Sequence, residues 1–150
     1  TAIASNINNI YAGKDLAASP DGRLAGEPVS DAASPSRGAD KKGPTSVVNS
    51  ISKPDYTLVS CGTVLNQKYS PQTFSDPDKR ARLLALIKIY FKKGGQEIQI
   101  NSVSRDVLKD AMDNPENYTD LVVRVSGFSA FYTTLSKDVQ KDILMRTEHE

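Results

Sequence analysis

The longest regular pattern of apolar residues lies between positions 77 and 93 and predicts a helix. Asp76 suits the N-cap, Pro77 suits the first turn, and Gly94-Gly95 suits the end. The apolar side chains surround the helix axis, and do not line one stripe, so we expect a helix that is buried on all sides. They are Leu83, Leu84, Leu86, Ile87, Ile89, Tyr90 and Phe91.

The pattern changes from helical to alternating after the two glycines. Glu97–Asn101 carries apolar residues at every second position, which predicts a strand. Ser104 then suits the N-cap of a helix that runs to about Met112, and Pro115 follows as a helix breaker. A last helix is predicted after Ser136, with its apolar positions facing inward.

Three short β-branched or aromatic runs predict further strands: Val47–Ile51, Tyr56–Val59 and Leu121–Val125. Ser126-Gly127 ends the third run abruptly, as a tight turn or a close backbone approach would. Residues 1–60 are otherwise rich in Gly, Pro, Ser and Asp. Composition alone would make that stretch a flexible tail or linker.

Bulk properties exclude several classes of function. The 150 residues carry a formal net charge of +1 without a block of like charge, which disfavours nucleic acid and anionic membrane as partners. No apolar run approaches the roughly 18 residues that span a bilayer, so we expect a soluble, cytoplasmic protein. Cys61 and His149 are the single cysteine and histidine, which excludes an internal disulfide and a metal site built from either type. We expect His149 to be solvated, and Lys41-Lys42 to lie in a solvated loop.

Several motifs along the chain together resemble a known protein family, and this resemblance implies a function. It rests on Arg124-Val125-Ser126-Gly127-Phe128 with Ser136, Gln140, Arg146 and Thr147, and, upstream, on Gly94-Gly95-Gln96, Asn101 and Pro115-Glu116-Asn117-Tyr118. Together these residues resemble the C-terminal signature of the glycyl radical enzymes, the relatives of pyruvate formate-lyase. Segments 19–28 and 34–53 resemble a region upstream of the radical domain in these enzymes, and segment 61–71 resembles the dehydratase and lyase branch of the family. The resemblance implies that the N-terminal stretch is an ordered set of loops and a strand beside the active site.

The resemblance makes Gly127 the residue that carries a stable backbone radical. The chemistry requires glycine, because the radical is stabilised when Cα becomes planar and the electron spreads over both flanking amides, and a Cβ would then clash with neighbouring carbonyls. Arg124, Ser126 and Phe128 would support the radical loop, in a buried site that keeps oxygen out. For Arg124 two interpretations stay open: an ion pair or backbone contact that fixes the loop, and a direct role in docking an activating enzyme.

The implied fold is α/β, namely the C-terminal part of a ten-stranded barrel into which the radical loop inserts. Residues 1–93 would belong to the catalytic barrel and residues 94–150 would form the glycyl radical domain. The implied reaction removes water, an amine, sulfite or carbon dioxide from a small polar substrate. No cofactor would be bound, because a separate radical S-adenosylmethionine enzyme installs the radical. The full enzyme is expected to be a homo-oligomer.

The chain does not contain every part that this chemistry needs. Family members pass the radical to a cysteine on a separate upstream loop, and in this branch a glutamate follows two residues later. Cys61 is followed by Gly62 and Thr63, so it departs from that pattern and is better explained as a small buried residue. The rest of the catalytic polypeptide, or a larger subunit, must therefore supply the cysteine. The alternatives are a free-standing glycyl radical subunit that rescues a damaged partner enzyme, an acyltransferase like pyruvate formate-lyase, and a non-catalytic domain that retains the fold.

Overall fold

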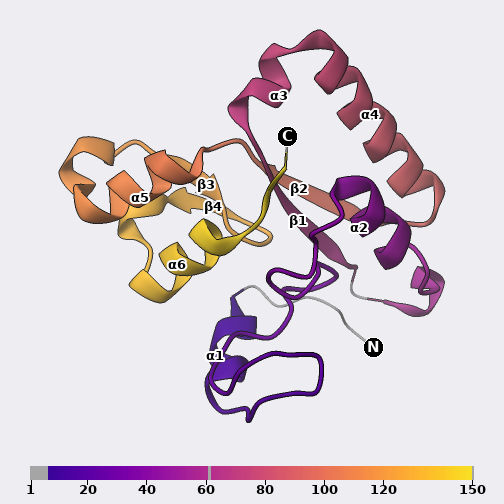
Figure 1. Ribbon diagram of the computed structural model, residues 1–150, viewed down its shortest axis with the longest axis horizontal. Helices are drawn as coiled ribbons and strands as arrows, with labels where there is room; N and C mark the ends of the chain where they lie inside the picture. Colours follow the sequence, from indigo (N-terminus) through magenta and orange to yellow (C-terminus); the bar gives the residue numbers. More distant parts are fainter. Residues whose placement is uncertain (1–6, 61, 150) are drawn as a thin grey trace.

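A parallel βαβ unit forms the centre of the computed structural model, which describes residues 7–60 and 62–149 (Figure 1). Strand β1 (Val64–Tyr69) leads through helices α3 (Pro71–Ser75) and α4 (Pro77–Lys92) to strand β2 (Glu97–Asn101). β1 and β2 run parallel, with Leu65 opposite Ile98. The short strand β5 (Glu148–His149) pairs in parallel with the other edge of β1, giving the order β2-β1-β5. The α/β class predicted from the sequence is confirmed.

Strand β1 was not predicted, because its middle residues are polar. Asn66, Gln67 and Lys68 interrupt the apolar pattern, yet all six residues of β1 are buried. A central parallel strand is covered on both faces, so its polar side chains must find partners inside the protein. Lys68, for example, is 1% exposed and donates to the carbonyl of Leu144 at 3.4 Å.

Helix α4 begins and ends as the sequence predicts. Asp76 accepts hydrogen bonds from the backbone N–H groups of Asp78 and Lys79, and Gly94 follows with φ +94°. The prediction that α4 is buried on all sides is wrong in this chain. Only Leu83, Leu86 and Tyr90 are buried, whereas Leu84, Ile89 and Phe91 are about half exposed. The helix therefore has one face on the sheet and an apolar face that the described residues leave uncovered.

The N-terminal stretch contains helices where strands were predicted. Residues 44–51 form helix α2 (Pro44–Ile51), which places both Val47 and Val48 against Leu65 and Tyr90 in one core. Pro44 suits the first turn, and tertiary packing overrides the β-propensity of the two valines. Residues 56–58 form the 3₁₀ turn η1 (Tyr56–Leu58), which the side chain of Asp55 caps. The strand expected in this stretch is therefore wrong, although the expectation of defined loops is confirmed.

A second core joins the remaining elements. It contains α1 (Asn8–Lys14), α5 (Arg105–Asp113), η2 (Pro115–Tyr118), β3 (Val122–Arg124), β4 (Ser129–Phe131), η3 (Tyr132–Thr134) and α6 (Lys137–Met145). Ser104 and Ser136 cap α5 and α6 as predicted. Tyr132 and Gln140 exchange two hydrogen bonds, from the hydroxyl at 3.0 Å and from the amide at 2.8 Å, which ties η3 to α6. In Figure 1, this group and the α2–α4 group lie on opposite sides of β1 and β2.

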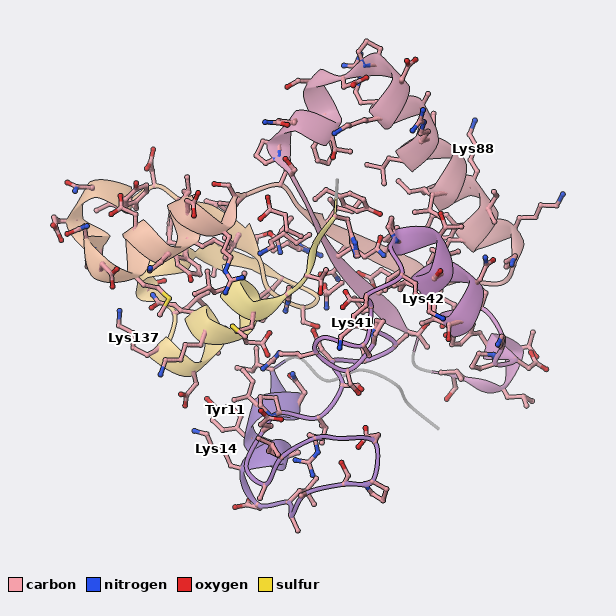
Figure 2. All side chains as sticks on the ribbon, in the orientation of Figure 1. Tyr11, Lys14, Lys41, Lys42, Lys88 and Lys137 are labelled. Carbon is pink, nitrogen blue, oxygen red and sulfur yellow. The ribbon has the colours of Figure 1, made fainter. Side chains whose placement is uncertain are left out.

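Among residues 7–60 and 62–149, no helix is long and apolar enough to cross a membrane. Lys41 and Lys42 are exposed on the loop before α2, as predicted (Figure 2). Cys61, which we expected to be buried, lies outside the described residues.

Candidate glycyl radical site

The glycine singled out by its sequence context lies at the tip of a β-hairpin. β3 and β4 are antiparallel, with Arg124 opposite Ser129, and Val125 N–H donates to the carbonyl of Phe128 at 2.9 Å. Ser126 and Gly127 are therefore the two loop residues. Gly127 has φ +81°, a left-handed conformation that glycine adopts without steric cost. The turn conformation and the radical chemistry expected from the sequence therefore both favour glycine at position 127.

The tip of this hairpin is not enclosed by residues 7–60 and 62–149. Val123 and Val125 are buried beneath it, but Gly127 is exposed, and Phe128 is 40% exposed. The described residues alone therefore do not form the buried site that was expected around Gly127. A two-residue hairpin loop projects beyond its strands, so only a body outside the described residues could cover it.

The neighbouring strand β2 holds the hairpin backbone from one side. Asn101 pairs with the main chain of Arg124: its amide donates to the carbonyl at 2.6 Å, and its oxygen accepts from the N–H at 2.7 Å. Two residues earlier, the side-chain oxygen of Gln99 accepts a hydrogen bond from Gly127 N–H at 3.0 Å. Side chains of β2 thus replace the ladder hydrogen bonds that a paired strand would supply.

Arg124 is half-buried and points along the same strand. Its Nε donates to the oxygen of Gln99 at 3.1 Å, and its Nη1 lies 3.3 Å from the hydroxyl of Ser129. Both partners are neutral side chains, so among the described residues hydrogen bonds hold this guanidinium, and not the ion pair or backbone contact that was one of the two interpretations. The contact with Gln99 links Arg124 to the amide of Gly127 through one shared oxygen.

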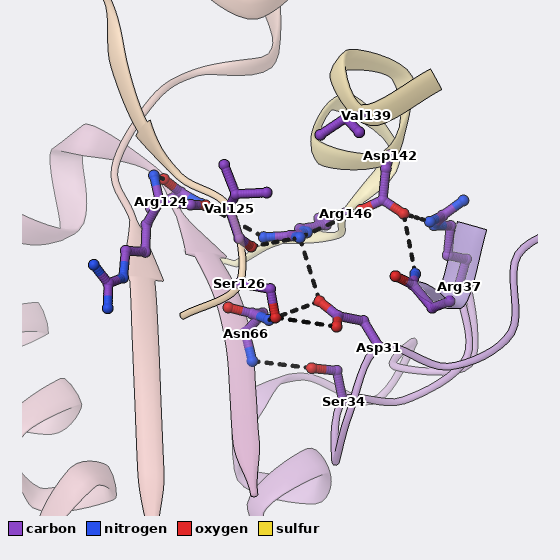
Figure 3. Close-up of polar contacts among 12 residues, drawn as sticks. Asp31, Ser34, Arg37, Asn66, Arg124, Val125, Ser126, Val139, Asp142 and Arg146 are labelled. Carbon is purple, nitrogen blue, oxygen red and sulfur yellow. Dashed lines mark hydrogen bonds and ion pairs between the residues drawn. The ribbon is translucent and has the colours of Figure 1, made fainter. Parts of the chain in front are cut away.

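Ser126 connects the tip of the hairpin to the N-terminal loops (Figure 3). Its hydroxyl donates to Asp31 at 3.2 Å and accepts from Asn66 of β1 at 3.3 Å. Asn66 also donates to the other oxygen of Asp31 at 2.7 Å, and its backbone N–H donates to Ser34 at 2.9 Å. Ser126 is 1% exposed, so a buried polar cluster lies directly under the exposed glycine.

Arg146, which follows α6, completes this cluster. Its Nη2 donates to the carbonyl of Val125 at 2.8 Å and lies 3.4 Å from Asp31 and 3.3 Å from Asp142. Burial lowers the pKa of Arg146 and Asp31 opposes that shift, yet an arginine stays charged. The planar fork lets one cation hold the hairpin carbonyl and two carboxylates together. Asp142 is held in addition by Arg37 and by Asn9, at 3.4 Å from the latter.

His149 lies at the edge of the same region. It was predicted to be solvated, but it is buried. It is 6% exposed, its ring centroid is 5.6 Å from that of Tyr69, and its Nε2 is 3.7 Å from Asp40. Pairing of β5 with β1 draws it inward. Burial lowers the pKa of His149, and the nearby Asp40 only partly opposes this.

We expect the stability of the fold to fall as the pH drops below about 6.5, the usual pKa of histidine. The unfolded chain then binds a proton at His149 that the folded chain takes up only at lower pH, so unfolding becomes more favourable. Urea unfolding from pH 8 to pH 5 should show this loss, and His149→Phe should reduce its slope. An unchanged slope in that variant would mean that other groups cause it.

The residues offer little to a metal ion. Within the part of the chain that the structure describes, no group of three His, Cys, Asp or Glu side chains is arranged to hold one. The carboxylates near the hairpin are instead paired with guanidinium and amide groups.

The sequence analysis singled out Gly127 but not most of the residues that surround it. Asn101 and Arg146 were noted as parts of the family resemblance without a role, and Gln99 and Asp31 were not noted at all. An alternating strand with polar residues at positions 97, 99 and 101 could have suggested a polar face directed at a neighbouring element. Asp31 gave no signal, because it lies in an irregular loop 95 residues before Ser126.

Comparison with known proteins assigns this hairpin to a family. The glycine radical family model matches residues 29–133, so the chain belongs to the glycyl radical family. It is 44% identical over 142 residues to "Probable dehydratase YbiW" of Escherichia coli K12, covering 94% of this chain and 18% of that protein. It is 40% identical over 140 residues to trans-4-hydroxy-L-proline dehydratase of Clostridioides difficile, covering 93% and 18%.

A solved structure agrees with this assignment. The B12-independent glycerol dehydratase from Clostridium butyricum, in its glycerol-bound form, superposes with a TM-score of 0.90 at 45% identity, over 94% of this chain and 18% of that one. The chain thus spans about 18% of the length of these relatives. The family predicted from the sequence is confirmed.

Proposed function

We propose that this chain is the radical-storing C-terminal portion of a glycyl radical enzyme of the dehydratase or lyase type, and that Gly127 stores the radical. One observation carries the proposal: the backbone around Gly127 is fixed on several sides while its α-carbon stays exposed. Gln99, Asn101 and Arg146 hold the main chain, and Asp31 holds Ser126. A glycine that exchanges a hydrogen atom with a group outside this chain needs a fixed backbone and a face that this chain leaves open.

The chemistry proceeds by transfer of single hydrogen atoms. A radical S-adenosylmethionine activating enzyme removes one hydrogen atom from the α-carbon of Gly127 and leaves the unpaired electron there. A cysteine outside this chain then returns its thiol hydrogen to Gly127 and becomes a thiyl radical. The thiyl takes a hydrogen atom from a small polar substrate, which loses water, an amine, sulfite or carbon dioxide. Return of the hydrogen atom restores the thiyl, and then the glycyl radical.

In this scheme the described residues of this chain hold the hairpin in position. Asn101 and Arg146 fix the position of the hairpin, because they donate hydrogen bonds to the carbonyls of Arg124 and Val125. Ser126 prevents the loop from rotating, because both its hydroxyl contacts are buried. Phe128 and the exposed face of α4 offer apolar surface to the rest of the catalytic polypeptide.

The wider assembly follows from the same proposal. The missing part of a ten-stranded barrel encloses Gly127, residues 1–93 contribute to that barrel, and residues 94–150 form the radical domain. We propose a cytoplasmic homo-oligomer that binds no cofactor of its own. The exposed glycine supports this arrangement, since a radical in an open hairpin would meet oxygen at once.

Oxygen should cut the activated chain at Gly127. A planar Cα radical has no side chain to shield it, so oxygen adds to it and the peroxyl product breaks the backbone. Mass spectrometry after exposure of the anaerobically activated protein to air should show a large piece that ends at Ser126 and a small piece that begins near Phe128. Without the covering barrel the chain should lose its radical faster than the complete enzyme does.

Protein that was never activated is the control and should stay whole under the same exposure. Cleavage elsewhere, or equal cleavage without activation, would show that the radical does not reside on Gly127.

A further inference from the structure

Gln99 is the side chain that contacts the amide nitrogen of Gly127. Its Oε1 accepts the N–H of Gly127 at 3.0 Å, and Nε of Arg124 donates to the same oxygen at 3.1 Å. Gln99 is 6% exposed and comes from the middle of β2, opposite Asn66 of β1. It is therefore a buried acceptor on a rigid strand, aimed at one particular peptide group.

The orientation of the Gln99 side-chain amide is fixed by its surroundings. Its Nε2 donates to the carboxylate of Glu97, which can only accept. Rotating the amide by 180° would place its NH₂ against the N–H of Gly127 and the Nε–H of Arg124, three donors without an acceptor. The carbonyl oxygen is therefore directed at Gly127, and Arg124 occupies its second lone-pair direction.

This contact bears on the radical itself. The unpaired electron at Cα spreads onto the amide nitrogen on one side and the carbonyl on the other, and this needs both amide planes to be coplanar with the trigonal carbon. An acceptor on the N–H increases electron donation from nitrogen and prevents rotation of that amide. Hydrogen bonds in a water-poor environment are stronger than in bulk solvent, and Gln99 is almost inaccessible.

We propose that Gln99 is a positioning residue that stabilises the Gly127 radical through its hydrogen bond to the Gly127 N–H, with Arg124 and Glu97 holding its amide in place. This rests on the proposed function of Gly127 as the radical residue. The role differs from that of Asn101 and Arg146, because those side chains hold the backbone of the neighbouring residues and do not contact the amide nitrogen that shares the spin.

The test uses the complete enzyme that carries this chain, activated anaerobically and observed by EPR. Gln99→Met keeps the length of the side chain and removes the acceptor, so more spin should remain on Cα and the α-hydrogen splitting should widen. Gln99→Glu, combined with Glu97→Gln so that position 97 donates to position 99, supplies a stronger acceptor and should narrow the splitting. Ser129→Ala is the matched control, since it removes the other side-chain partner of Arg124 and leaves Gln99 on Gly127.

A second readout is the exchange of the α-hydrogen with D₂O, which in the proposed scheme proceeds through the cysteine and so measures how readily Gly127 gives up its radical. If the hydrogen bond favours the radical by about 1 kcal/mol over closed-shell glycine, Gln99→Met should speed this exchange about fivefold. A structural role alone would lower the yield of radical without moving the splitting.

The outcomes separate the two proposals. Wild-type enzyme without a doublet would overturn the proposed function itself. A wild-type doublet with unchanged splitting in Gln99→Met or in the double variant would overturn the role of Gln99 alone, as would an equal shift in Ser129→Ala. Should Gln99→Met fail to form a radical, the shift in the double variant decides the question.

Discussion

Gly127→Ala will leave the activated enzyme without an EPR doublet. Two effects act together in this variant. Alanine at φ +81° costs roughly 1–2 kcal/mol of backbone strain, and its Cβ prevents the planar geometry that stabilises the radical. The loss of signal should be complete, because strain alone would lower the yield and leave some radical. Deuterated glycine incorporated into the wild-type protein should collapse the doublet to a single line.

Gly94→Ala is the matched control for strain. Gly94 has φ +94° with open space around the position of a Cβ, so alanine is strained there to a similar degree without touching the hairpin. This variant should fold less stably and still carry the radical. An unchanged spectrum in Gly127→Ala, or a lost doublet in Gly94→Ala, would contradict the assignment.

Arg146→Met should lower the free energy of unfolding by about 3–5 kcal/mol, the usual cost of removing one partner from a buried charge pair. Asp31 and Asp142 would lose their shared cation, and the carbonyl of Val125 would lose its donor. Urea unfolding of the purified protein measures the change. The radical yield should fall as well, because the hairpin is no longer held.

Lys14→Met provides the comparison, since it breaks an ion pair with Asp138 in which both side chains are about half exposed. Solvent screens such a pair, so little stability should be lost. Arg146→Lys should lie between the two, because one ammonium cannot reach all three acceptors at once. Equal destabilisation in Arg146→Met and Lys14→Met would refute the view that the buried cluster matters.

The elements with strong local signals were predictable from the sequence. Asp76, Ser104 and Ser136 each precede a helix and cap it as predicted. The alternating run Glu97–Asn101 is a strand, and residues 122–124 form β3 within the predicted run 121–125. Helix caps and strand alternation depend on residues that are close together in the chain, so they can be predicted from the sequence.

The features that failed depend on distant parts of the chain. Val47 and Val48 have strand propensity but lie in helix α2, where both join Leu65 and Tyr90 in one core. His149 was expected in solvent and is drawn inward by pairing with β1. The partners of Gly127 come from β2, and those of Ser126 from β1 and the loop of Asp31, so no local pattern could reveal them.

The buried polar cluster beneath the hairpin also determines when, during synthesis of the chain, its contacts can form. Asp31 is synthesised 95 residues before Ser126 and 115 residues before Arg146. Contacts between such distant positions form late in folding, because the intervening chain must first be closed into a loop. A nascent chain that already contains Gly127 but not Arg146 lacks the guanidinium that holds the carbonyl of Val125 and the carboxylate of Asp31. The hairpin should therefore reach its final geometry only after Arg146 has been synthesised and the cluster has closed around Asp31.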